Sequence, residues 1–151
     1  RENYVQTFKI PSVSMAPTLK SGDYIMVDMT YYRTRPPQRG DVVVLSLPEA
    51  PETNIVKRIV AVGGDTVEVS GMSLVLNGSK VETPNASWQS GGRMSFGPAT
   101  VPPGSVFLLG DNRDFSKDSR HWETTFPGVD RLRGKVLYIY LPVGRAGLWV
   151  Q

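Results

Sequence analysis

The sequence predicts a mostly β protein, and three observations support this fold class. The chain has 151 residues of which 40% are hydrophobic, enough to form the core of one domain, or of a domain with a small insertion. Its 15 glycines and 12 prolines indicate many turns. The apolar residues fall in short, β-branched runs, and no stretch has the periodicity of a long amphipathic helix.

The first half of the chain predicts three strands separated by polar loops. Alternating apolar residues indicate a strand over 4–10, and a second follows over 24–28. Residues 31–40 contain a Pro-Pro step and are expected to form a loop. The nearly continuous apolar run 41–45 predicts a buried strand, whereas 47–53, with two prolines and two glutamates, is expected to be a loop.

The strongest strand signal spans residues 54–62 and ends at a Gly-Gly-Asp turn. Residues 66–69 are expected to form the next strand. Residues 74–81 predict a hairpin, because Asn77-Gly78 supplies the positive φ angles that a tight turn needs.

The remainder of the chain predicts two further strands around irregular segments. Residues 83–104 are rich in Ser, Gly and Pro and are expected to form a long irregular connection. Short apolar runs predict strands over 106–109 and 134–140, and the tail ends with an apolar stretch at 148–150.

Composition excludes several kinds of chemistry. The chain has no cysteine, so disulfides and thiolate nucleophiles are excluded, and the single histidine, His121, excludes a multi-histidine metal site. No cofactor is expected. The net charge of +3 is mild, and the densest cationic run, residues 131–135, is expected to be a solvated rim, so no nucleic-acid partner is predicted.

Neither a membrane span nor a signal peptide is visible in the sequence. No apolar run approaches the ~18–20 residues that cross a bilayer. The chain begins at Arg1, close to its first motif, and this predicts a fragment whose beginning has been removed.

A stiff turn at residues 11–19 holds the candidate nucleophile. Ser12 and Ser14 lie between Pro11 and Pro17, which restrict the backbone around them. A serine on a rigid turn can be a nucleophile, but a serine between prolines is more often structural. Catalysis requires a second group that accepts the hydroxyl proton.

Two residues are candidates for that base. His121 fits by residue type and would make a Ser-His-Asp arrangement. Lys57 shares one face of the 54–62 strand with Ile55 and Ile59, while Arg58 points to the opposite face. Burial among apolar neighbours would lower the lysine pKa by the roughly 2–3 units that a base near neutrality needs. The alternative is an edge-strand Lys-Arg pair whose charged ends both reach water.

Several separated motifs together resemble one family, the type I signal peptidases. They span most of the chain in the family's order. They are residues 11–19, Gly22-Asp23, residues 39–43, residues 56–58 with 63–65, residues 110–113, Ser116 and residues 118–120.

The resemblance implies an antiparallel β fold of the signal peptidase type with a small inserted β-hairpin region. It implies a catalytic core of residues 1–65 and 105–151 and an insertion of residues 66–104. It also implies a role for each matched residue. Ser14 matches the nucleophile, Lys57 the general base, Ser12 with the Ser14 backbone N–H the oxyanion donors, Ser116 the serine that orients the lysine, Asp118 and Arg120 a supporting ion pair, and Gly110, Asp111 and Asn112 a turn beside the site.

The resemblance further implies the substrate and the setting. The family removes signal peptides from exported preproteins after small residues at the −1 and −3 positions. Residues matching its substrate pocket are Phe8, Ile10, Met15, Leu19, Ile25, Ile55 and Val56. The substrate is expected to bind extended along the 8–13 edge.

The family works at the cell membrane, with its catalytic domain on the extracytoplasmic face. The membrane anchor that normally precedes the first strand is absent, so a soluble, monomeric catalytic fragment is expected. Phe8, Leu148 and Trp149 are candidates for contact with a lipid surface, the alternative being ordinary core packing of all three. The chain departs from the family pattern after Arg120, where Glu123 replaces a glycine.

Two other functions remain open from sequence. One is a self-cleaving repressor-type Ser-Lys protease, although only thirteen residues precede Ser14 and they hold no Ala-Gly or Cys-Gly pair. The other is a non-catalytic β module that binds peptide or membrane with a decayed site. The presence of Ser12, Ser14, Lys57 and Ser116 together favours an intact site.

Overall fold

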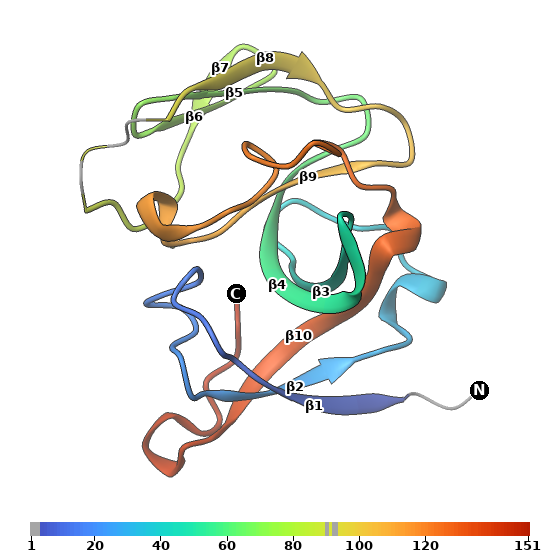
Figure 1. The fold of residues 1–151 in the computed structure, drawn as a ribbon, viewed down its shortest axis with the longest axis vertical. Coiled ribbons are helices and arrows are strands. Elements are labelled where there is room, and N and C mark those ends of the chain that lie inside the picture. Colours follow the sequence, from blue (N-terminus) through green and yellow to red (C-terminus); the bar gives the residue numbers. More distant parts are fainter. Residues whose placement is uncertain (1–3, 90, 92–93) are drawn as a thin grey trace.

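Two antiparallel sheets make up the computed structural model, which describes residues 4–89, 91 and 94–151 (Figure 1). The predicted mostly β fold class is confirmed. The larger sheet has the strand order β1 (Val5–Lys9), β2 (Tyr24–Asp28), β10 (Leu132–Leu141), β3 (Val42–Leu47), β4 (Ala50–Val62), β9 (Val106–Leu109). The smaller sheet has the order β7 (Ser79–Val81), β6 (Ser73–Leu76), β5 (Thr66–Ser70), β8 (Phe96–Thr100). The 3-10 turns are η1 (Tyr31–Arg33), η2 (Arg113–Phe115), η3 (Val129–Arg131) and η4 (Val143–Arg145).

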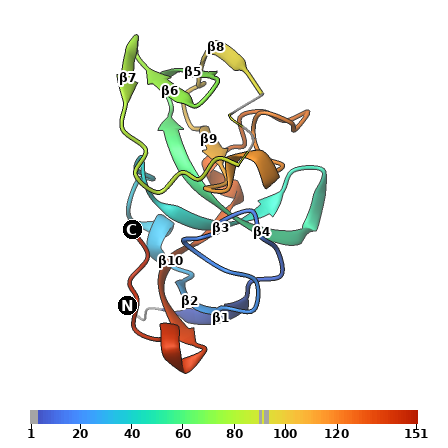
Figure 2. The ribbon, with the colours of Figure 1, turned by 90° about the vertical axis from the view of Figure 1, so that its left-hand side faces the viewer.

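Strand β4 connects the two ends of the molecule. Figures 1 and 2 show β1, β2 and β10 at one end, the smaller sheet at the other, and β4 between them. β4 pairs with β3 on one side and β9 on the other. Its neighbour β3 is buried on both faces, as expected for a continuous run of valine and leucine in a central strand.

The two sheets share part of their apolar core. Val60 of β4 and Phe107 of β9 pack in one cluster with Val67 of β5 and Leu74 of β6. The smaller sheet therefore buries its inner face against the larger one. The division of the chain into a core and an inserted region at residues 66–104 stays a prediction.

The structure corrects two loop predictions. Residues 50–53 belong to β4, because the β3–β4 hairpin extends to a Leu47–Ala50 pair and the Ser46 hydroxyl donates a hydrogen bond to the Pro51 carbonyl at 2.7 Å. Residues 96–100 form β8, which adds to the edge of β5, and the Phe96 ring packs 4.9 Å from that of Phe107. Residues 90, 92 and 93 of the predicted irregular connection lie outside the described residues.

The predicted hairpin is confirmed. β6 and β7 pair around Asn77 and Gly78, whose φ angles are 53° and 84°. Within the described ranges no helix has both the length and the apolarity needed to cross a bilayer.

We predict that Gly134→Ala destabilises the fold, because the end of β2 lies against Gly134 of β10 with no room for a side chain. A Cβ there would lie 2.6 Å from the Asp28 carbonyl oxygen. Overpacking of this kind costs about 1–3 kcal/mol. Gly144→Ala is the matched control, since a Cβ at Gly144 has no neighbour within 4 Å. Urea unfolding of both variants measures the difference, and equal stabilities would contradict the close approach.

Candidate active site

The turn that follows β1 places Ser12 and Ser14 side by side. The Ser14 hydroxyl lies 3.2 Å from that of Ser12, and the Ser14 backbone N–H donates to the Ser12 Oγ at 3.5 Å. Ser14 is buried to 8% exposure, whereas Ser12 is exposed. The hydroxyl of Ser12 and the N–H of Ser14 are thus close enough to donate to one shared oxygen atom, as an oxyanion site requires.

The turn after β9 fixes the position of Ser14. The Asn112 backbone N–H donates to the Ser14 carbonyl at 2.9 Å, and its side-chain amide donates to the Val13 carbonyl at 3.0 Å. Gly110 allows this close packing, because a Cβ there would lie 2.6 Å from the Ser14 carbonyl oxygen and would also overlap the Ser116 side chain. The hydrogen bonds of Asn112 and the close approach of Gly110 are the contacts by which residues 110–112 pack beside the serine turn.

Ser14 and Lys57 line one cleft of about 240 Å³. Ser14 comes from the turn after β1 and Lys57 from the centre of β4, so the two meet only in the folded chain. Lys57 is 6% exposed and Arg58 is 7% exposed. The alternative in which both cations reach water is therefore wrong.

Burial lowers the pKa of Lys57 to about 8. The nearby carboxylate of Asp118 opposes this shift, and the positive charge of Arg120 adds to it. Because the desolvation of the ammonium dominates, a large fraction of Lys57 is neutral at mildly alkaline pH. A neutral lysine beside a serine is able to accept the hydroxyl proton.

Asp118 and Arg120 form a buried ion pair next to Lys57. The guanidinium Nε lies 2.8 Å from Asp118 Oδ1, and both side chains are 1% exposed or less. Burial alone would raise the pKa of Asp118, but its contacts with His121 and Arg120 outweigh burial and hold it below its usual range. Asp118 is therefore a fixed negative charge that limits how far the pKa of Lys57 can fall.

The Ser116 hydroxyl donates to Asp118 Oδ2 at 2.8 Å. Among the described residues no hydrogen bond joins Lys57 to either Ser14 or Ser116. The oxygen lone pairs of Ser116 stay available as acceptors for a lysine N–H. Its assignment as the residue that orients Lys57 remains a prediction.

Arg58 points away from Lys57, as the strand alternation predicts. Its Nε and Nη2 donate to the two carboxylate oxygens of Asp111 at 2.9 and 2.8 Å. Asp111 also accepts a hydrogen bond of 2.6 Å from Thr18, four residues after Ser14. This buried pair thereby ties β4 to the serine turn.

Five of the seven predicted pocket residues lie on the wall of the cleft. They are Phe8, Ile10, Met15, Ile55 and Val56. The other two, Leu19 and Ile25, have 0% exposure and lie in the core cluster behind it. They support Ile10 and Met15 from below, so placing them on the pocket surface was wrong.

Neither His121 nor Trp149 lines this cleft. The His121 ring is 32% exposed, and its Nδ1 lies 3.6 Å from Asp118 Oδ1. It is not among the residues that line the cleft with Ser14. Leu148 and Trp149 are 52% and 66% exposed, so core packing of these two is excluded.

Sequence reasoning missed the contribution of residues 84–89. The Ser87 N–H donates to the Asp111 carbonyl at 2.6 Å, and the Arg113 N–H donates to the Ser87 carbonyl at 2.9 Å. The Arg113 guanidinium is buried, and its carbon lies 5.4 Å from the centre of the Trp88 ring. The isolated Trp88 in a polar stretch was the only sequence signal for this contact.

Comparison with known proteins identifies the family. The model of the signal peptidase family, peptidase S26, matches residues 1–141. The chain belongs to this family. Membership of a peptidase family makes the chain a peptidase, and the resemblance seen in the motifs is confirmed.

Relatives and a solved structure agree. The chain is 36% identical over 145 residues to a signal peptidase I of Leptolyngbya laminosa, covering 91% of this chain and 70% of the relative. It is 34% identical to a probable signal peptidase I-2 of Synechocystis sp., covering 92% of this chain and 64% of the relative. A signal peptidase I crystal structure from Enterococcus faecalis V583 aligns with a TM-score of 0.56 at 28% identity, covering 67% of this chain and 97% of that one. The part of the chain that the family model matches, residues 1–141, therefore contains the residues of the cleft and all the strands of both described sheets.

We predict that Asp111→Ala costs about 3–5 kcal/mol of stability, because it leaves the buried Arg58 charge without its carboxylate and with one hydrogen bond, to the Gly40 carbonyl. The matched control is Arg39→Ala, which breaks an ion pair with Asp65 in which Arg39 is 49% exposed. Asp65 keeps hydrogen bonds from the Val62 N–H and Asn77, so the control is expected to cost about 1 kcal/mol. Denaturant unfolding compares them, and a smaller loss for Asp111→Ala would contradict a central role for this pair.

Proposed function

We propose that the chain is the catalytic part of a signal peptidase I that cleaves exported preproteins with a Ser14–Lys57 dyad. The observation that carries this proposal is the shared cleft, in which Ser14 lies on a fixed turn and the pKa of Lys57 is lowered to about 8. Membership of the S26 family supports the reaction class.

The reaction follows from these groups. Neutral Lys57 takes the Ser14 proton as Ser14 Oγ attacks the scissile carbonyl carbon, and the resulting oxyanion accepts hydrogen bonds from the Ser14 N–H and the Ser12 hydroxyl. Losing one such donor typically costs ~10²–10³ in rate. The Lys57 ammonium then gives its proton to the leaving amine. Lys57 next takes a proton from a water molecule as its oxygen attacks the acyl carbon, and the Lys57 ammonium returns that proton to the Ser14 oxygen as the acyl bond breaks.

The substrate is proposed to bind as an extended strand. Among the described residues β1 is an edge strand that pairs only with β2 in the larger sheet, so its other edge offers free backbone groups. The apolar cleft wall at Phe8, Ile55 and Val56 continues from this edge. A cleft of about 240 Å³ suits small side chains at the −1 and −3 positions of a signal peptide.

Location at the cell membrane is proposed from the family and from two exposed apolar side chains. We place the enzyme at the outer face of the cell membrane, acting as a monomer on preproteins that carry signal peptides. Leu148 and Trp149 lie exposed in the tail after β10, where an apolar side chain can enter a lipid interface.

We predict that Ser14→Ala and Lys57→Ala each lower turnover of a peptide with an Ala-x-Ala site by about 10⁴-fold or more. His121→Ala is the control and is expected to leave turnover largely intact, since His121 does not line the cleft. Circular dichroism checks that each variant is folded. Loss of turnover in His121→Ala with the fold unchanged would replace the dyad with a triad, and retained turnover in Ser14→Ala would rule out the proposed nucleophile.

We predict that the activity of the chain depends on the protonation state of Lys57. The base form of Lys57 is the reactive one, so kcat/KM is expected to rise with pH, with a midpoint near the Lys57 pKa of about 8, and to level off above it. A series of initial rates across this range measures the midpoint. The dyad assignment fails if the rate is flat there or falls as the lysine loses its proton.

A further inference from the structure

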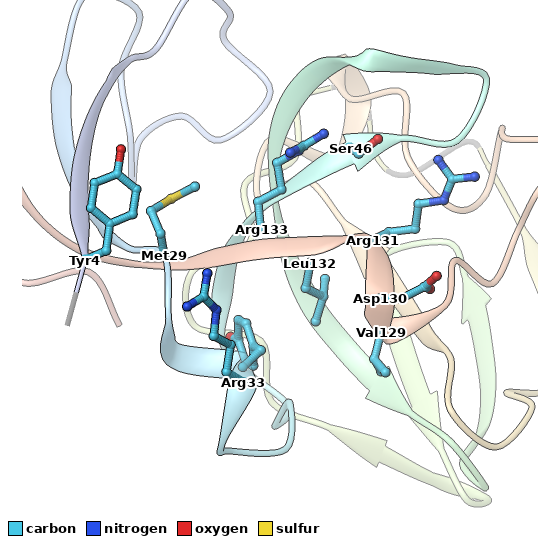
Figure 3. Close-up of a pocket in the computed structure, with 10 residues that line it drawn as sticks. Tyr4, Met29, Arg33, Ser46, Val129, Asp130, Arg131, Leu132 and Arg133 are labelled. Carbon is cyan, nitrogen blue, oxygen red and sulfur yellow. The ribbon is translucent and has the colours of Figure 1, made fainter. Parts of the chain in front are cut away.

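A second cleft, separate from the one that holds Ser14 and Lys57, is basic. It has a volume of about 610 Å³ and shares no lining residue with the catalytic cleft. Figure 3 shows that its side chains come from η1, η3, the start of β10, β3 and the residues flanking β1 and β2. Its charged members are Arg33, Arg131, Arg133 and Asp130.

The three arginines of this cleft have no charge partner among the described residues. Within the described part of the chain, the guanidiniums of Arg33, Arg131 and Arg133 form neither an ion pair nor a side-chain hydrogen bond. Lys135, two positions further along β10, differs because its ammonium lies 3.6 Å from Asp41. The cationic run of residues 131–135 therefore contains one neutralised charge and two free ones.

The fold gathers these charges in one place. Leu132, between Arg131 and Arg133, is buried, so the two arginines project away from the core, and Figure 3 shows them on the side of β10 where Ser46 lies. Arg33 arrives from η1, which is fixed by a hydrogen bond of 2.9 Å from the Tyr32 hydroxyl to Asp41. Figure 3 shows the Arg33 side chain rising from η1 toward β10.

We propose that this cleft binds a phosphate-bearing anion. Guanidinium groups bind phosphate oxygens through paired, charge-assisted hydrogen bonds, and three of them line the cleft against the single carboxylate of Asp130. A compact phosphate group fits better than a nucleic-acid strand, because the cationic run is short and the cleft lining holds two tyrosines, Tyr4 and Tyr32, rather than a row of aromatic rings for successive bases. The phosphate belongs either to a phospholipid headgroup or to a soluble phosphate ester.

Two binding experiments on the whole chain separate these sources. Calorimetric titration with inorganic phosphate and with glycerol 3-phosphate measures binding of a soluble ligand. Co-sedimentation with phosphatidylcholine vesicles, with and without phosphatidylglycerol, measures binding of a lipid headgroup. The test variant is Arg131→Ala/Arg133→Ala. The charge-matched control is Arg35→Ala/Lys80→Ala, which removes two exposed cations that do not line the cleft.

The test variant is expected to lose about tenfold or more in affinity, while the control stays close to the unchanged chain. A loss confined to phosphatidylglycerol vesicles assigns the phosphate to a lipid headgroup, and a loss confined to the soluble ligands assigns it to a phosphate ester. The proposal is overturned if the unchanged chain binds neither probe, or if test and control variants bind equally. Neither readout depends on peptide cleavage, so the result is independent of the proposed peptidase activity.

Discussion

The site depends on the hydrogen bonds that the carboxylate of Asp111 accepts. This carboxylate accepts two hydrogen bonds from Arg58 on β4 and one from Thr18 on the serine turn. The backbone N–H of Asp111 donates to the Met15 sulfur at 3.4 Å. Three segments that are far apart in sequence therefore share one buried group. The turn that carries Asp111 also brings Asn112 to the carbonyls of Val13 and Ser14. Moving this carboxylate would displace the serine and the strand of the lysine together.

Lys57 and Arg58 show how one strand uses two neighbouring cations in opposite ways. Arg58 stays charged in the interior because Asp111 pairs with it through two hydrogen bonds, which offsets the cost of desolvation. Lys57, on the other face, receives no such pairing, so burial lowers its pKa. Their roles follow from what faces each side of β4 and would be exchanged by a shift of one residue in register.

The smaller sheet contributes to the site through the segment that leaves it. Ser87 exchanges backbone hydrogen bonds with both sides of Asn112, and the Trp88 ring covers the buried guanidinium of Arg113. One terminal nitrogen of Arg113, Nη1, is buried without a hydrogen-bond partner among the described residues, so the aromatic face is a favourable neighbour for it. Residues 84–89 are in this way packed against the turn that holds Ser14.

Local sequence determined most of the strands, the Asn77-Gly78 hairpin, the stiff serine turn and the opposite directions of Lys57 and Arg58, because each depends on backbone preference or on the two-residue period of a strand. Local sequence could not place residues 50–53 and 96–100 in strands, since their pairing partners across the sheet outweigh their prolines and glycines. It also could not separate the wall of the cleft from the core behind it, where Leu19 and Ile25 lie. Only the tertiary structure decided the burial of Lys57, the partner of Ser116 and the contact of Trp88 with Arg113. Each of these depends on segments that are distant along the chain and meet only after folding.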